Sequence, residues 1–192
     1  AGAVDINPPH LYLVTGERGA GKTRFCRAVA ELAWRSGWQV GGLLSPAEFA
    51  SGEKTGITLQ CLPEGGSYPL ATRCNQPPFT LKMGEWFFDP QVLEWGNTML
   101  EALANATMET KSLDLLVIDE IGPLELLRGE GWTAALPLLN NGKYYTGLVV
   151  IRPELVDRAR ALLPAFHGII SLDGSMNLEE EAGKWWEVHS HE

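Results

Sequence analysis

Two glycines followed by a lysine and a threonine are the clearest chemical signal in the chain. Gly16, Gly21, Lys22 and Thr23 have the spacing G-x-x-x-x-G-K-T within the segment "VTGERGAGKT". Glycines allow a tight turn that aims several backbone N–H groups at one anion. A lysine at this place can reach the β- and γ-phosphates of a nucleotide, and the neighbouring hydroxyl can ligate Mg²⁺. The spacing therefore predicts a loop that binds a triphosphate together with magnesium.

A pair of carboxylates supplies the second half of such a site. Asp119 and Glu120 follow the mainly apolar run 113–118, which is typical of a buried strand. We expect Asp119 to emerge on a strand next to the phosphate loop and to hold Mg²⁺ together with Thr23. Glu120 can orient or deprotonate the water that attacks the triphosphate, with Lys22 as the second catalytic residue. The alternative for Glu120 is a solvated strand end or a structural ion pair.

The elements that must position these residues alternate along the chain. Apolar runs predict buried strands at 11–16, 40–45, 113–118, 146–151 and 168–172, and alternation predicts a hairpin at 55–73 and one more strand within 79–89. Helical spacing predicts helices at 22–37, 90–110, 125–140 and 153–163, and a helix or partly ordered tail at 177–188. Asp89 is the expected N-cap of the second helix, with Pro90 in its first position.

This order of elements predicts an α/β fold of three layers. Strands that alternate with helices favour a mostly parallel sheet flanked by helices on both faces. We expect the antiparallel hairpin to extend one edge of that sheet. A chain of 192 residues fits a single domain, 1–192, with a core at about 11–180 and a tail at each end.

Composition excludes several classes of function. A net charge of −9 argues against nucleic acid as a partner, and no apolar run approaches the roughly 18 residues of a membrane span. The N-terminal segment 1–10 has neither the basic head nor the apolar core of a signal peptide. Three cysteines without a CxxC spacing and four scattered histidines form no zinc signature. We therefore expect a cytoplasmic protein. The two motifs above imply Mg²⁺ as its cofactor, and the sequence does not identify a protein partner.

The two motifs together resemble the thermophilic nucleoside-triphosphatase family, which are small single-domain enzymes with a phosphate loop. The family typically reads Asp-Glu-Ile-Gly-x-Met/Leu-Glu-Leu after its core strand, and this chain reads "DEIGPLEL" at 119–126. Looser similarities are Thr55-Gly56, Gly84, Trp86 and Leu93-Glu94. The resemblance covers about residues 11–180.

The resemblance implies a phosphate-loop NTPase fold of the additional-strand, catalytic-glutamate type. It also implies hydrolysis of ATP, GTP and other nucleoside triphosphates to the diphosphate and phosphate. The nucleotide contacts that it implies are Gly16, Glu17, Arg18, Gly19, Ala20, Gly21, Lys22, Thr23, Leu115, Leu116, Val117, Ile118, Asp119, Glu120, Ile121 and Gly122.

The chain departs from the family where an arginine is often found near the phosphates. The family often has Thr-Glu-x-x-Arg after its second strand and Asn-Arg near its C-terminus. Here these places read "SPAEF" at 45–49 and Asn177-Leu178. Arg18 in the loop and Arg152 at the end of a predicted strand are the first candidates for a transition-state cation. Arg73 and Arg128 are weaker candidates, and for each of the four a surface charge is favoured over a catalytic role.

Seven tryptophans invite the idea that one of them stacks on a base. Trp34, Trp86 and Trp95 fall on faces that we expect to be buried, so we assign them to the core. Trp185-Trp186 can cover a groove or an interface, and the terminal "HSHE" is expected to be a disordered tail.

Two other functions stay open. One is a small-molecule or nucleotide kinase, although the basic residues form no arginine-rich lid. The other is a nucleotide-dependent switch or regulatory subunit, to which a partner supplies the missing cation.

Overall fold

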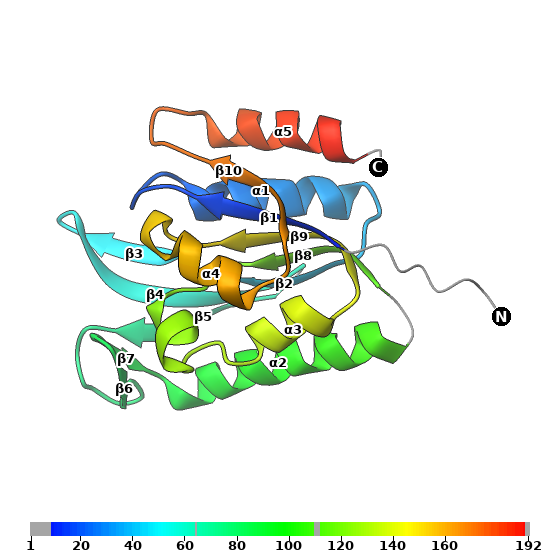
Figure 1. Ribbon diagram of the computed structural model, residues 1–192. Helices are drawn as coiled ribbons and strands as arrows, with labels where there is room; N and C mark the ends of the chain where they lie inside the picture. The colour runs from blue at the N-terminus through cyan, green and yellow to red at the C-terminus, as the bar shows by residue number, and fades with distance from the viewer. Residues whose placement is uncertain (1–8, 64, 110–111, 191–192) are drawn as a thin grey trace.

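In the part of the chain that the structure describes, a ten-stranded sheet organises the fold, and helices cover both of its faces (Figure 1). The computed structural model describes residues 9–63, 65–109 and 112–190. The strands are β1 (His10–Thr15), β2 (Val40–Leu44), β3 (Ala47–Ala50), β4 (Glu53–Leu62), β5 (Ser67–Thr72), β6 (Leu81–Met83), β7 (Trp86–Phe88), β8 (Leu113–Ile118), β9 (Tyr144–Val150) and β10 (Phe166–Ser171). The helices are α1 (Lys22–Arg35), α2 (Pro90–Glu109), α3 (Ala135–Asn141), α4 (Val156–Leu162) and α5 (Leu178–His189), with a π-helical turn at Leu124–Arg128 and a 3-10 turn at Pro153–Leu155.

The sheet has a parallel half and an antiparallel half. Its strands run in the order β10-β1-β9-β8-β2-β4-β5-β7-β6, and β3 pairs with β4. The first five are parallel to one another. From β4 onwards each strand is antiparallel to its neighbour. The predicted α/β fold with a hairpin at one edge is therefore confirmed, and the segment 79–89, predicted as one strand, forms the small hairpin β6–β7.

Strand register brings the chemically important loops to one edge of the sheet. Val14 pairs with Val150, Val149 pairs with Ile118, and Ile118 pairs with Leu43. The carboxyl ends of four parallel strands are thus level, and the loops that follow them meet at this edge, where open α/β sheets bind ligands. One expectation was wrong in detail. We expected the acidic pair to follow a strand adjacent to β1. Instead β9 lies between β1 and β8, so one strand separates the strand before the phosphate loop from the strand before the acidic pair.

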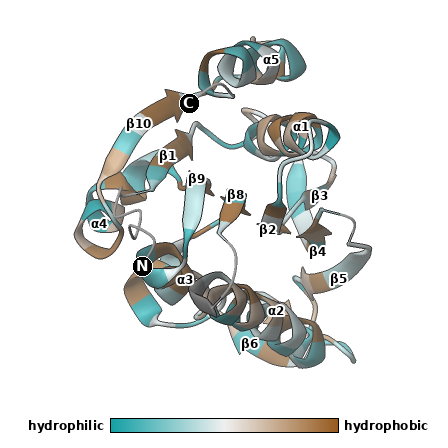
Figure 2. Ribbon diagram, turned by 90° about the vertical axis from the view of Figure 1, so that its right-hand side faces the viewer, coloured by the Kyte–Doolittle hydropathy of each residue, from teal (hydrophilic) through white to brown (hydrophobic). Residues whose placement is uncertain are grey.

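Two apolar cores hold the three layers together. On one face, α1 and α5 pack on the sheet through Phe25, Val29, Ala182 and Trp185. On the other face, α2, α3 and α4 contribute residues such as Leu100, Leu138 and Ala159. Figure 2 shows the same division from the side, with α1 and α5 opposite α2 and α3. Among the described residues, no helix has the length and apolarity needed to cross a membrane.

The helix predicted over 125–140 is wrong. The chain forms the π-helical turn, then an irregular segment with positive φ at Gly129 and Gly131, and only then α3. A Cβ at Gly131 would clash with the Glu125 carboxylate, so this position excludes other residues. Because glycines in the left-handed region interrupt a helix, the apolar periodicity on either side belongs to two separate elements.

Two of the three tryptophans assigned to the core are also placed differently. Trp34 and Trp95 are 43% and 44% exposed, because they lie on the outer faces of α1 and α2. Trp86 is partly exposed and lines a cavity. The buried tryptophans are Trp132 and Trp185, and Trp185 stacks on His189.

The ends of several predicted elements need separate comment. His189 belongs to the end of α5 rather than to a disordered tail. The N-terminal segment up to residue 8, the turn residue 64, the helix end at 110 and the last two residues lie outside the described residues.

Candidate active site

The predicted phosphate loop connects β1 to α1. Gly21 has a φ of 89°, and a Cβ there would lie 2.7 Å from Leu178 Cγ, so the position requires glycine. The Lys22 ammonium lies back over the loop and donates to the Gly16 carbonyl at 2.6 Å. The first turn of α1 contains no acidic residue and no side chain caps it. The positive end of this 14-residue helix is therefore directed at the loop, as an anion-binding site requires.

The two predicted magnesium ligands meet although 96 residues separate them. The Thr23 hydroxyl donates to Asp119 Oδ2 at 2.6 Å, and the Ser45 backbone N–H points at the same oxygen from 3.4 Å. Asp119 is only 3% exposed. Burial raises the pKa of Asp119 to about 6, against the opposing effects of the Thr23 hydrogen bond and the Lys22 charge. A hydroxyl and a carboxylate oxygen side by side are hard ligands of the kind that Mg²⁺ prefers, so this donor set fits the metal.

Glu120 faces a cation across the end of the sheet. Arg152 Nη2 lies 3.4 Å from Glu120 Oε1, and the two side chains are 40% and 25% exposed. Arg152 follows β9 and Glu120 follows β8, and these strands are neighbours in the sheet. The candidate water-activating carboxylate and one candidate cation are thus a pair.

These groups surround one polar cavity of about 430 Å³. That volume lies within the range of small-molecule sites. Its lining includes Gly16, Glu17, Arg18, Lys22, Thr23, Ser45, Ala47, Phe49, Lys54, Arg73, Glu85, Trp86, Asp119, Glu120, Arg152, Pro153 and Glu154. The phosphate loop and the acidic pair therefore line the same cavity. The sequence had associated them only because both motifs occur together in phosphate-loop proteins.

Other residues expected to contact the nucleotide do not line this cavity. The residues 115–118 and Ile121 are fully buried and line neither this cavity nor a second one beside it. Gly19, Ala20 and Gly21 belong to the loop without lining the cavity, and Gly122 lines the second cavity. These residues shape the site from within the sheet and the loop.

The four candidate arginines occupy different places. Arg18 lies 5.8 Å from the centroid of the Phe49 ring at the rim of the polar cavity. Arg73 stacks on Trp86 at 4.0 Å and pairs with Glu85 at 2.9 Å, so its charge is already engaged. Arg128 lines only the second cavity. Arg152 is therefore the arginine of this group that faces the acidic pair.

One cation of the site had no signal in the sequence. Lys54 reaches both cavities from β4, in the antiparallel half of the sheet. Burial lowers its pKa, Glu120 acts in the opposite direction, and Arg152 and Arg18 lower the pKa further. Sequence reasoning noticed only the neighbouring Thr55-Gly56 pair, because a lysine in a hairpin is usually a surface charge.

Glu125 holds the segment that follows the acidic pair. Its carboxylate accepts hydrogen bonds from the Gly122 N–H at 2.8 Å and the Trp132 N–H at 2.9 Å. Burial raises the pKa of Glu125 to about 7, although both hydrogen bonds act to lower it. The residue ties the loop after Glu120 to the start of the segment that leads into α3.

Comparison with known proteins agrees with this arrangement. Residues 11–163 match the protein family described as NTPase. A nucleoside-triphosphatase THEP1 from Thermococcus kodakarensis is 31% identical over 150 residues, which cover 78% of this chain and 79% of that protein. One from Hyperthermus butylicus is 31% identical over 152 residues, covering 77% and 74%. One from Methanopyrus kandleri is 29% identical over 118 residues, and that match spans 61% of its length.

Two solved structures share the fold. The crystal structure of THEP1 from the hyperthermophile Aquifex aeolicus has a TM-score of 0.61 at 22% identity, over 89% of this chain and 96% of that one. The solution structure of a human cancer-related nucleoside triphosphatase has a TM-score of 0.63 at 22% identity, over 96% and 99%. With the loop, the acidic pair and the sheet edge that joins them, these matches show that the chain belongs to the NTPase family of nucleoside-triphosphatases.

Proposed function

We propose that the protein hydrolyses nucleoside triphosphates, among them ATP and GTP, to the diphosphate and phosphate in a Mg²⁺-dependent reaction. The observation that carries this proposal is the junction of Thr23 and Asp119 at 2.6 Å inside a cavity that Lys22 and Glu120 also line. The names of the relatives, all nucleoside-triphosphatases, support the same reaction.

Each residue has a role that follows from its position. The Lys22 ammonium, beside the Gly16 carbonyl, would pair with the β- and γ-phosphates. Thr23 and Asp119 would hold Mg²⁺, which when bound neutralises and orients the phosphate oxygens. Glu120 would accept the proton of the attacking water, and its carboxylate is partly exposed on the cavity wall. Arg152 lies close enough to Glu120 to meet the charge that develops on the γ-phosphate.

A broad range of bases follows from the same geometry. The functional groups described above act on the phosphates and not on a base edge. Discrimination beyond about 100-fold requires buried hydrogen bonds that a wrong substrate leaves unpaired. We therefore expect kcat/KM for ATP, GTP, CTP and UTP to differ by less than about 100-fold.

The test is phosphate release by the purified protein with each of the four triphosphates, with Mg²⁺ and with the metal chelated. A protein that binds nucleotide but releases phosphate only when another protein is added would contradict hydrolysis by this chain alone and would support the switch function. We also propose that the protein acts in the cytoplasm. The three cysteines are free, and unpaired thiols are typical of a reducing compartment.

A further inference from the structure

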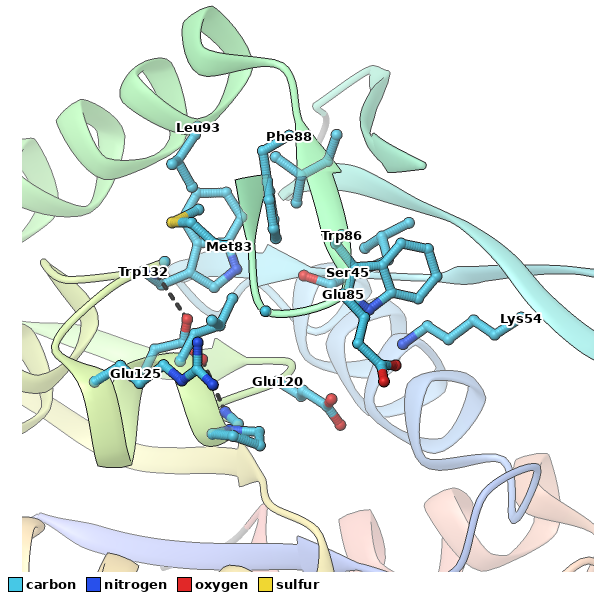
Figure 3. Close-up of a pocket in the computed structure, with 18 of the residues that line it drawn as sticks. Ser45, Lys54, Met83, Glu85, Trp86, Phe88, Leu93, Glu120, Glu125 and Trp132 are labelled. Atoms are coloured by element: carbon cyan, nitrogen blue, oxygen red, sulfur yellow. Dashed lines mark hydrogen bonds between the residues drawn. The ribbon is translucent and has the colours of Figure 1, made fainter. Parts of the chain in front are cut away.

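A second cavity of about 290 Å³ adjoins the phosphate-binding cavity. It lies between α2, the hairpin β6–β7 and the π-helical turn, and Figure 3 shows the side chains that line it. Met83, Phe88, Leu93 and Trp132 gather on one side of it, whereas Lys54, Glu85 and Glu120 lie on the other side. The cavity is thus apolar at one end and charged at the other.

The charged end opens into the site of the proposed reaction. Ser45, Lys54, Glu85, Trp86, Glu120 and Arg152 line both cavities. Glu120 is the group that we place beside the attacking nucleophile, so the second cavity begins on the γ-phosphate side of the nucleotide site. A molecule bound in it would therefore have one end next to the reacting phosphorus.

The charges around the second cavity balance one another. Its carboxylates are Glu85, Glu120 and Glu125, and its cations are Lys54, Arg128 and Arg152. When all six are ionised, the three charges of each sign cancel, and the remaining lining is mainly apolar. The preferred occupant is therefore uncharged, with an apolar body that fills the end formed by Trp132, Leu93 and Met83.

An unsatisfied hydroxyl marks where the polar group of such a molecule would lie. Ser45 Oγ is buried and has no hydrogen-bond partner among the described residues. Ser45 lines both cavities, and its backbone N–H points at the magnesium ligand Asp119. Buried hydroxyls are normally hydrogen-bonded, and one that is not indicates a missing partner. Ser45 Oγ has almost no accessible surface, so rotation about χ1 would have to turn it toward the cavity, where a hydroxyl on the bound molecule would supply the partner beside Glu120.

We propose that the second cavity binds a small uncharged alcohol with an aromatic or alicyclic body, and that the enzyme transfers the γ-phosphoryl group to its hydroxyl. This inference rests on the proposed function, because it uses the same triphosphate, Lys22 and Glu120. Hydrolysis is then the reaction in which water occupies the place of the alcohol.

The transfer step balances without a further reactant. The alcohol oxygen forms a bond to the γ-phosphorus as the bond from that phosphorus to the β–γ bridging oxygen breaks. The hydroxyl proton passes to the Glu120 carboxylate and from there to solvent. The products are a phosphate monoester of the alcohol and the nucleoside diphosphate.

The experiment measures nucleoside diphosphate and inorganic phosphate in the same reaction. Hydrolysis releases them in a ratio of one, whereas transfer releases diphosphate in excess by the amount of ester formed. The probes are benzyl alcohol, 2-phenylethanol and cyclohexylmethanol with MgATP, and ³¹P NMR identifies the ester. At least one probe is expected to raise the ratio to two or more. Toluene, which has the body but no hydroxyl, is expected to leave the ratio at one.

Substitutions at Leu93 connect the effect to the cavity. Leu93 is a half-buried residue of α2 that lines the second cavity and has no part in the phosphate site. L93F is expected to hydrolyse MgATP at a rate within about twofold of the wild-type rate and to form much less of the phosphate ester. L93A enlarges the cavity and should favour a larger alcohol such as indole-3-ethanol. L127F is the control, since Leu127 is 59% exposed and lines neither cavity.

The outcomes separate the two proposals. A ratio of one with every alcohol, in a protein that releases phosphate, overturns the acceptor site and leaves the hydrolase intact. An ester yield that L93F and L93A leave unchanged also overturns it. Transfer to AMP or GMP without transfer to any alcohol would contradict the uncharged acceptor. A protein that forms no diphosphate under any condition would contradict the proposed function itself.

Discussion

Arg152 Nη2 lies 3.4 Å from Glu120 Oε1, and the two residues follow neighbouring parallel strands. The carboxylate that we propose as the proton acceptor thus lies beside a cation that could compensate the charge on a reacting phosphate. Glu120 and Arg152 are far apart in the sequence. The pairing of β8 with β9 brings them together, and the predictions below test the chemistry that this arrangement permits.

Glu120→Gln is expected to lower kcat by about 10²–10⁴-fold and to leave nucleotide affinity nearly unchanged. The amide keeps the shape of the side chain but cannot take the proton of the attacking water. Lys22, Thr23 and Asp119 are untouched, so the variant should retain the triphosphate. Single-turnover hydrolysis and equilibrium binding measured on the same preparation check this. Hydrolysis at the wild-type rate would make Glu120 a strand-end carboxylate, and Glu125 would be the next base to test.

Lys22→Ala is expected to weaken triphosphate binding and to abolish turnover. The β- and γ-phosphates would lose the ammonium that lies over the loop at the Gly16 carbonyl. Nucleotide binding measured by calorimetry, with ATP and ADP compared, checks this. The loss should be larger for the triphosphate, and equal losses would show that Lys22 does not reach the γ-phosphate.

Asp119→Asn is expected to lose activity mainly through the metal. The amide keeps one oxygen but removes the charge, so the Mg²⁺ concentration for half-maximal activity should rise at least tenfold. Thr23→Ala removes the second ligand and should shift the same curve. A titration of phosphate release against Mg²⁺ measures both. Near-normal activity of either variant at low Mg²⁺ would show that the metal lies elsewhere.

Lys54→Met is expected to lower kcat more than it raises KM. Lys54 is the cation that β4 places beside Glu120, and the loss of one donor to a developing charge typically costs about 10²–10³-fold in kcat. Lys82→Met is the matched control, since Lys82 is exposed and lines neither cavity. Steady-state measurement of kcat and KM for both variants tests this prediction. Equal, small effects would make Lys54 a packing partner of Trp86 and nothing more.

Glu125→Gln is expected to change how stability depends on pH. The pKa of Glu125 rises from its ordinary 4.5 to about 7 in the folded protein, so between these values the folded state binds more protons than the unfolded state. The carboxyl group's contribution therefore falls as pH rises through this window, by about 3 kcal/mol in total. The amide does not titrate and imitates the protonated form.

The measurement is urea unfolding of wild type and Glu125→Gln at pH 5 and pH 9. The wild type should lose about 3 kcal/mol of unfolding free energy relative to Glu125→Gln when the pH is raised from 5 to 9. Glu154→Gln, at an exposed position, is the control and should show no such change. A difference that is the same at both pH values would show that Glu125 titrates normally.

The sequence by itself determined the elements that local chemistry specifies. The phosphate loop, the helix that begins at Lys22 and the strand that ends just before Asp119 were predictable because glycine spacing and apolar runs act over a few residues. Asp89 was predictable as a cap for the same reason, and its carboxylate accepts from the Gln91 N–H at 3.0 Å. The parallel sheet followed from the alternation of strands and helices.

Only the tertiary structure decided which residues share the site. Strand order inserted β9 between β1 and β8, which paired Arg152 with Glu120. The antiparallel half of the sheet brought Lys54 and Trp86 to the same edge, and no local pattern places either of them in the site. The expected helix is interrupted at Gly129 and Gly131 by their positive φ, and the buried Glu125 carboxylate occupies the space of a side chain at Gly131. Contacts between residues distant in sequence depend on strand order and packing, and these arise only when the whole chain folds.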